Sequence, residues 1–397
     1  TGVKGETLAG LDLSSTTHTN AGTYATDGWT FTDATGNYNN ASGTVSDHIA
    51  KANATISVNA YSVTYDGNTH TATGSATGVK GETLAGLDLS GTTHTNAGTY
   101  ASDPWTFHDP NGNYADGSGA VSDSIGKANA AIGVSGYSVT YDGNSHTATG
   151  SATGVKNETL AGLDLSGTTH ANAGTYATDA WTFTDAAGNY NNASGTVSDA
   201  IARAKAAISV TPYSVTYDGN AHTATGSATG VKGESLSGLD LSNTTHTNPG
   251  AYNDSWTFTD ATGNYNGASG IAKDAIGYGF LGLEAPYAPP PTTFNVQRTM
   301  PIVWQYTNAN GAVVNSAAAN PQVQIFSCGT IPDNSTQDIT VDSAGNSGYQ
   351  YNSTTNTWQF NWQVKASNLQ AGCYDIYIVS GQTGQMSRGF PINITSH

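Results

Sequence analysis

The sequence predicts an all-β protein: tandem copies of one small immunoglobulin-like β-sandwich module, followed by a distinct C-terminal immunoglobulin-like domain. Three observations predict this fold class. A long repeat runs through most of the chain, apolar residues alternate with a period of two, and glycine-rich turns separate the short apolar runs. Alternating runs with frequent turns are typical of sandwiches, and no segment has a helical period.

The repeat is clearest in the string Tyr-Asp-Gly-Asn, which begins at Tyr65, Tyr141 and Tyr217, 76 residues apart. The strings Thr-Thr-His and Trp-Thr-Phe recur with it. The junction segments, such as 127–130, are short and leave little slack, so we expect the modules to form a semi-rigid rod. The predicted domains are a partial module at 1–54, full modules at 55–130, 131–206 and 207–282, a Pro-rich linker at 283–292 and a terminal domain at 293–397.

Within a module the side chains alternate as β-strands require. Ile132 and Val134 form one such pair, and Trp181 and Phe183 form another. Segments such as Asp142-Gly143-Asn144 lie between these runs and supply the positive φ angles of tight turns. The partial first module lacks the stretch that matches 55–76, so we expect it to expose unpaired sheet edges.

The chain changes character after the last module. Consecutive prolines in 283–292 predict a stiff polyproline spacer. In the terminal domain, Ile302, Trp304 and Tyr306 share one strand face. A second run, 358–364, places two tryptophans on a single face, which is the pattern of a buried strand.

Two cysteines occur in the chain, Cys328 and Cys373, and both lie in strand-like runs of the terminal domain. Neither belongs to a Cys-x-x-Cys or Cys/His pattern, which disfavours a metal site or redox catalysis. We predict a structural disulfide between them, and hence a secreted or extracellular protein.

Composition excludes several function classes. The chain has 12 Lys and Arg against 29 Asp and Glu, a net charge of −17, so it offers no basic surface for nucleic acid. No apolar stretch is long enough to insert into a membrane. No nucleophile elbow or placed pair of carboxylates is found, so we expect no enzymatic activity and no cofactor.

The module's motifs, Tyr-Asp-Gly-Asn-x-His, Thr-Asn-Ala-Gly-Thr-Tyr, Gly-Asn-Tyr and Ile-x-Lys-Ala, resemble the MBG-type tandem repeats of bacterial surface proteins over residues 1–280. The terminal domain resembles the PxKF domain, although Pro301-Ile302-Val303-Trp304 replaces both the Lys and the Phe of that motif. The resemblance implies a bacterial, secreted or cell-surface protein whose repeats act as spacers, and it implies no ligand.

Two sets of residues are candidates for ligand binding. The acidic turns offer oxygen ligands for calcium, although they lack the alternating acids of a calcium loop; the candidates are Asp33, Asn37, Asp185 and Asn189. Tyr349 and Tyr351 could form a sugar-stacking platform on the terminal domain. The paired histidines of each module could meet across strands, but we expect them to be hydrogen-bonded or solvated.

These observations predict a structural stalk or extracellular fibre component. One alternative is an adhesin whose terminal domain binds a glycan or a surface protein. Another is a subunit of a self-assembling filament, in which a neighbouring copy completes the first module by strand complementation.

Overall fold

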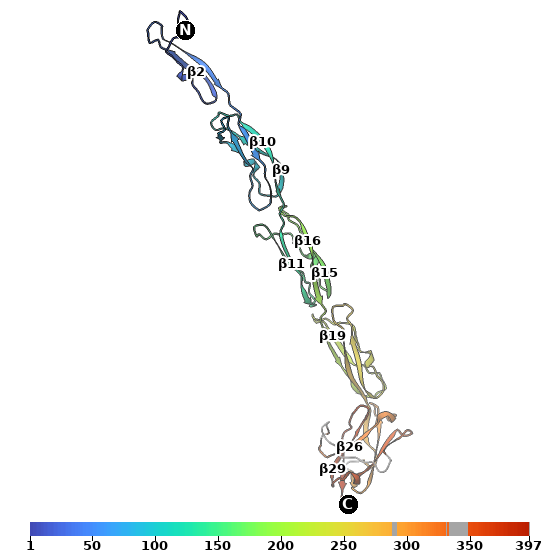
Figure 1. The fold of residues 1–397 in the computed structure, drawn as a ribbon. Coiled ribbons are helices and arrows are strands. Elements are labelled where there is room, and N and C mark those ends of the chain that lie inside the picture. Colours follow the sequence, from blue (N-terminus) through green and yellow to red (C-terminus); the bar gives the residue numbers. More distant parts are fainter. Residues whose placement is uncertain (288–291, 331, 333–347, 397) are drawn as a thin grey trace. The chain divides into compact units, whose positions relative to one another are not determined.

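The computed structural model describes residues 1–287, 292–330, 332 and 348–396. In this part of the chain, strands alternate with 3-10 turns of three or four residues, and no α-helix is present. The chain is therefore all-β, a series of small β-sandwich modules followed by a different β-sandwich (Figure 1). The predicted fold class is confirmed.

The module at 55–130 shows the plan. Two sheets face each other, one with strand order β4-β6-β7 and the other with order β5-β10-β9-β8. Strand β5 pairs in parallel with β10, while the other pairings are antiparallel. The strands are β4 (Thr55–Asn59), β5 (Ser62–Thr64), β6 (Thr73–Thr77), β7 (Thr83–Leu84), β8 (Leu87–Asp88), β9 (Gly98–Phe107) and β10 (Gly117–Gly126), with the turn η2 (Ser90–Thr92).

The next two modules repeat this plan, with the sheets β11-β13 and β12-β16-β15-β14 in one and β17-β19 and β18-β22-β21-β20 in the other. The second module contains β11 (Ala131–Ser135), β12 (Ser138–Thr140), β13 (Thr149–Thr153), β14 (Leu163–Asp164), η3 (Ser166–Thr168), β15 (Gly174–Phe183) and β16 (Ala193–Ala202). The third contains β17 (Ala207–Thr211), β18 (Ser214–Thr216), β19 (Thr225–Thr229), β20 (Leu239–Asp240), η4 (Ser242–Thr244), β21 (Gly250–Phe258) and β22 (Ala268–Gly277).

Each full module has a small core drawn from both sheets. In the module at 55–130, Phe107 is 1% exposed and Ala76 of the facing sheet is equally buried. Ile56 and Leu87 pack against them. A Cβ on Gly119 would lie 2.4 Å from the Trp105 ring, so the tryptophan covers a strand position that only glycine can occupy. Cores of this size give only modest stability.

The partial module has one sheet, β1-β2-β3, built from β1 (Leu11–Asp12), β2 (Gly22–Phe31) and β3 (Ala41–Ile49) with the turn η1 (Ser14–Thr16). The face that β4 and β6 cover in the next module is open here. Leu11 and Leu13 are consequently 55% and 49% exposed. Strand complementation by a neighbouring copy stays a prediction.

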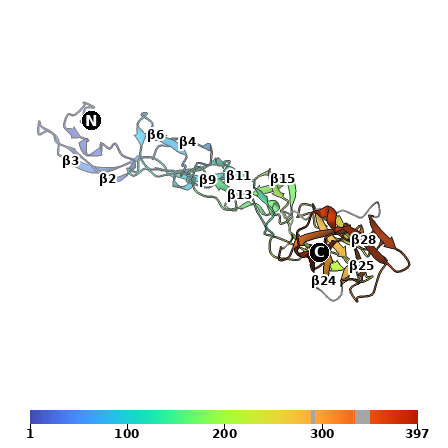
Figure 2. The same cartoon turned by 90° about the horizontal axis from the view of Figure 1, so that it is seen from below.

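The terminal domain is a sandwich of two four-stranded sheets, β23-β25-β28-β27 and β24-β30-β29-β26. Figure 2 labels β25 and β28 of the first sheet and β24 of the second. Its elements are β23 (Gly279–Leu283), β24 (Thr292–Asn295), β25 (Thr299–Thr307), η5 (Ala317–Ala319), β26 (Gln322–Ser327), β27 (Tyr349–Asn352), β28 (Thr357–Gln363), η6 (Val364–Ser367), β29 (Gly372–Val379) and β30 (Phe390–Thr395).

The terminal sandwich begins earlier than the sequence predicts. Strand β23 pairs with β25, and Tyr278, Leu283 and Tyr287 lie in the terminal core. The predicted start at residue 293 and the predicted spacer from 283 therefore both need correction. The apolar and aromatic side chains of this segment are buried in the core of the terminal domain. The prediction of a spacer considered only the prolines of the segment and therefore missed this burial. Residues 288–291 lie outside the described part of the chain.

The predicted core faces of this domain are confirmed. Ile302, Trp304 and Trp362 are all 0% exposed, and Tyr306 is 3% exposed. Trp304 is opposite Trp358 in the pairing of β25 with β28, and their rings stack. Apolar residues at every second position of two neighbouring strands thus build one continuous core.

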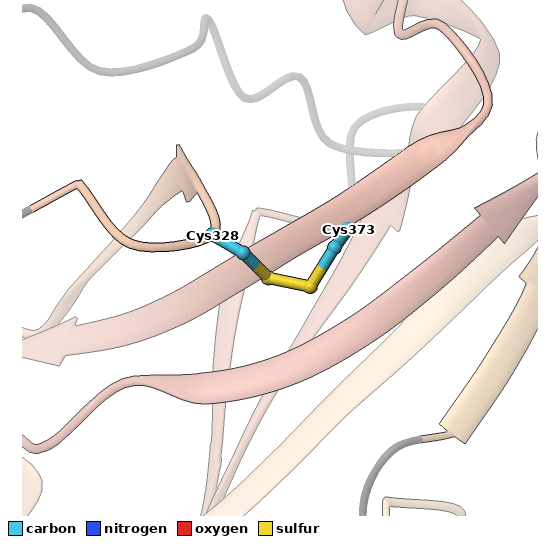
Figure 3. The surroundings of a disulfide bond; sticks show 2 residues. All are labelled: Cys328 and Cys373. Atoms are coloured by element: carbon cyan, nitrogen blue, oxygen red, sulfur yellow. A yellow bond between two sulfur atoms is a disulfide. The ribbon is translucent and has the colours of Figure 1, made fainter.

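Cys328 and Cys373 form the predicted disulfide (Figure 3). Cys328 follows the end of β26, and Cys373 lies at the start of β29, the strand that pairs with β26. The Cys328 N–H also donates a hydrogen bond of 3.1 Å to the Cys373 carbonyl oxygen. The bond thus closes a loop across a pair of strands that are already neighbours.

Candidate functional site: the module junctions

The junction segments are bonded into the module that follows them. The Ala128 N–H donates to the carbonyl oxygen of Asn189 at 3.0 Å, and the Asn191 N–H donates to the Ala128 carbonyl oxygen at 2.8 Å. Ala52 makes the same two bonds with residues 113 and 115, and Ala204 makes them with 264 and 266. The short segment that links two modules is therefore a bridge strand with fixed partners.

A side-chain amide forms a second contact at each of these junctions. Asn189 of the Gly-Asn-Tyr turn is 7% exposed, and its Oδ1 accepts the Ala97 N–H of the preceding module at 2.8 Å. Its Nδ2 donates to Asn96 Oδ1 at 3.4 Å. The same contacts recur between Asn113 and residues 20–21, and between Asn264 and residues 172–173.

The last module lacks the backbone N–H donor that the other modules offer to the Asn side chain of the next module. Its counterpart of Ala21, Ala97 and Ala173 is Pro249, which has no N–H to donate. No further copy of the module follows it, because the terminal sandwich comes next. Instead, the Ala309 N–H of the terminal domain donates to the Tyr217 carbonyl oxygen at 2.8 Å. Loss of the donor thus coincides with a change of neighbour.

An aromatic side chain of one module enters the core of the next. Tyr65, from the Tyr-Asp-Gly-Asn turn, packs against the buried cluster of Phe183 and Tyr190. Its ring meets Tyr190 edge-on, with 5.4 Å between centroids and an interplanar angle of 79°. Tyr141 and Tyr265 repeat this geometry at the following junction. Such edge-to-face pairs contribute about 0.5–1.5 kcal/mol beyond the area that they bury.

A lysine of the following module reaches back to the module before it. Lys156 Nζ donates to the Gly67 carbonyl oxygen of the preceding module, and Lys232 Nζ donates to that of Gly143. The sequence suggests that these lysines form exposed pairs with the glutamates two residues later. In the structure the Lys156 backbone N–H, rather than its ammonium group, bonds Glu158. The repeated Val-Lys-x-Glu string was the available signal, but it does not reveal a partner 89 residues away.

The calcium candidates have other roles in the structure. Asp33 and Asp185 accept hydrogen bonds from the backbone of their own turns; the N–H donors are those of Thr35, Asn37 and Tyr38 for Asp33, and of Ala187, Asn189 and Tyr190 for Asp185. Hydrogen bonds from Thr35 are the main reason that the pKa of Asp33 is lowered to about 2. The Asn37 amide donates to Thr35 Oγ1, and Asn189 belongs to the junction. These are Asx turns whose oxygens face N–H groups, an arrangement that leaves little room for a cation.

The module histidines do meet across strands, in a bridge between His70 and His94. Each is held by an aspartate: His70 Nε2 lies 3.0 Å from Asp66 Oδ1, and His94 Nε2 lies 2.9 Å from Asp103 Oδ2. His94 also stacks on the Tyr100 ring. Among the described residues no three His, Cys, Asp or Glu side chains form a group that could hold a metal ion.

Each full module also contains a buried carboxylate that the sequence analysis did not identify. Asp123 is 0% exposed; its Oδ1 accepts the Tyr61 N–H at 2.8 Å. Its Oδ2 is buried, and no N–H or O–H group of the described residues donates to it. Burial, followed by the nearby carboxylate of Asp103, raises the pKa of Asp123, and the His94 charge opposes this rise. Asp199 and Asp274 occupy the same position in the next modules, and their pKa values are also raised.

We expect these aspartates to make the stability of the modules depend on pH. Because the folded-state pKa is raised, their stabilising contribution is fully present below the ordinary value of about 3.9 and is lost as pH rises through the folded value. Replacing Asp123, Asp199 and Asp274 with asparagine removes this loss. The stability difference between variant and parent should therefore shift in favour of the variant as the pH rises above about 4, the ordinary pKa of an aspartate. Thermal unfolding at a series of pH values measures it; a constant difference contradicts the assignment.

The two tyrosines of the proposed sugar platform are engaged within the terminal domain. Tyr349 stacks on Phe360, and its hydroxyl oxygen accepts the Val323 N–H at 2.7 Å. Tyr351 packs against Trp358, and its hydroxyl lies within hydrogen-bond distance of Asn356 Oδ1. One ring face of each tyrosine thus supports the sheet, while Tyr349 keeps 39% of its surface exposed.

Comparison with known proteins gives structural matches only. No family model and no curated protein matches the sequence. Invasin, a bacterial integrin-binding protein, is matched over 86% of this chain and 79% of its own, at 10% identity and a TM-score of 0.28. The protocadherin GammaB4 extracellular domain is matched over 92% and 70%, at 13% identity and a TM-score of 0.20. Surface layer protein SbsC, domains 4–9, is matched over 82% of this chain and 42% of its own, at 10% identity and a TM-score of 0.18.

In the described part of the chain, no helix has the length and apolar character needed to cross a membrane.

Proposed function

We propose that the repeats act as a stiff extracellular spacer, the stalk or fibre component of a bacterial surface or secreted protein, which holds the terminal domain away from its point of attachment. One observation carries the proposal. The same Asn and bridge-strand contacts recur at three junctions, and the Tyr and Lys contacts recur at two of them. A flexible linker would need none of these contacts.

The physical reason is that flexibility between modules depends on free backbone torsions in the linker. Here the linking residues are tied by backbone hydrogen bonds, and a tyrosine from one module is packed in the core of the next. Bending would break several buried contacts at once, which is costly because a buried amide left without a partner loses about 1–3 kcal/mol. The disulfide fits an oxidising, extracellular location.

The proposal is tested by the distribution of distances between matching points of neighbouring modules. A narrow distribution supports a spacer of fixed length. A broad one, typical of modules on flexible tethers, contradicts it.

An adhesive role for the terminal domain is a second candidate function. It is favoured by a hollow where this domain meets the last module, which combines aromatic rings with an arginine.

A further inference from the structure

A preformed cavity of about 320 Å³ lies where the terminal domain meets the last module. Its wall includes Tyr278 at the end of the module, Tyr306 of β25 and the loop that carries Met386 and Arg388. Both sides are fixed in place. The Ala309 N–H bonds the Tyr217 carbonyl oxygen, and the Gln385 side chain lies so close to Gly277 that a Cβ there would be 1.8 Å from its Oε1. Ligand sites form preferentially at such domain interfaces.

Two features of the wall suit a polar ligand. Ser380 lines it and is 3% exposed, yet its Oγ has no hydrogen-bond partner in the described structure. A buried hydroxyl without a partner is costly, and a ligand hydroxyl or carboxylate would satisfy it. The aromatic faces of Tyr278 and Phe280 lie in the same wall and can cover an apolar surface of the same ligand.

The charge of the cavity selects the class of ligand. Among the described residues that line the cavity, Arg388 is the one that carries a charge, and its guanidinium lies over the Phe390 ring at 5.1 Å. No ion pair with Arg388 occurs among the described residues. An arginine that stacks on an aromatic ring and has no carboxylate partner among the described residues is suited to bidentate recognition of a ligand carboxylate. In a chain with a net charge of −17, this is a local exception to the general repulsion of anions.

We propose that this cavity binds a carboxylated sugar, a uronate or sialate unit of a glycan. Arg388 takes the carboxylate, the Ser380 hydroxyl bonds a sugar oxygen, and the aromatic wall packs against the C–H face of the ring. The inference goes beyond the spacer function and is independent of it, since the cavity depends on the terminal domain and the module beside it.

The two methionines of the chain make the test direct. Met386 lines the cavity, whereas Met300 is 1% exposed in the core of the same domain. The whole protein, labelled with ¹³C at the methionine methyl groups, is titrated with glucuronate, with N-acetylneuraminate and with neutral glucose. We expect a saturable shift of the Met386 signal with at least one acidic sugar, no shift of Met300, and no response to glucose.

Arg388→Gln should weaken this binding by about tenfold or more, because it removes a charge-assisted bond. Arg298→Gln, in the same domain but outside the cavity wall, should leave it unchanged. Both variants should keep the Met300 signal of the folded core. The proposal is overturned if neither acidic sugar shifts Met386, if glucose shifts it equally, or if Arg388→Gln binds like the parent. A broad distance distribution between modules would contradict the spacer function but would not affect the test of sugar binding.

Discussion

Replacing Phe183 with alanine is expected to destabilise its module by about 3–5 kcal/mol. Phe183 is 1% exposed and packs with Ala152 and Tyr190 in the core that also receives Tyr65 of the preceding module. A small domain has a total stability of only about 5–15 kcal/mol, and this loss should raise the population of the unfolded module by about a hundredfold or more. Hydrogen exchange resolved by segment measures the effect, with fast exchange expected throughout 131–206.

The partial module supplies a matched control. Phe31 holds the same strand position, but no second sheet covers it and it is only half-buried. Phe31→Ala should therefore cost much less than Phe183→Ala. Equal effects of the two substitutions would contradict the account of the module core, because they would show that the facing sheet adds nothing.

Loss of the disulfide should have an effect of similar size, confined to the terminal domain. The bond closes a loop with a sequence separation of 45 residues, for which chain entropy gives about 4 kcal/mol. Cys373→Ser should lower the unfolding temperature of the terminal sandwich and leave the transitions of the repeats in place. Calorimetry of the variant measures both the terminal and the repeat transitions. The parent under reducing conditions, which also lacks the bond, gives a second measurement.

Neither cysteine belongs to the buried cluster of the terminal core, and the repeats contain no cysteine. A shift of the repeat transitions together with the terminal one would show that the sandwich and the modules unfold as a single unit. That outcome would contradict the separation of the two cores.

Local patterns in the sequence were sufficient for the fold class and the cores. The alternation of Trp358 with Trp362, and of Ile302 with Trp304, predicts their burial because a strand has a period of two. The disulfide followed from two cysteines in strand-like runs. The strand patterns depend on neighbouring residues along the chain, and the disulfide was predictable because the chain has only two cysteines.

The junctions could not be predicted in this way. Asn189 was interpreted as a calcium candidate because its turn chemistry is visible in the sequence, while its partner Asn96 lies 93 residues away. The buried Asp123 was missed because its partner, the Tyr61 N–H, lies 62 residues away along the chain. The replacement of Ala by Pro249 in the last copy was a further visible signal, and it gains meaning only once the donor role of Ala97 is known.

The most direct test of the central claim is the distance between equivalent points on either side of a junction, measured by pulsed electron resonance. The exposed residues Ser75, Ser151 and Ser227 hold the same position in successive modules, and the native cysteines are bonded to each other, so introduced cysteines can be labelled selectively. The pairs S75C/S151C and S151C/S227C each span one junction. We expect narrow distributions with nearly equal means.

Adding N189A and K156M should broaden the first distribution and leave the second narrow, because these residues bridge only the first of the two junctions. The matched pair N37A and K80M, at equivalent positions without these contacts, should change neither. Narrow distributions that respond to N189A and K156M are the result that a contact-stiffened spacer predicts. Broad distributions in the parent, or no response to those two substitutions, would contradict it.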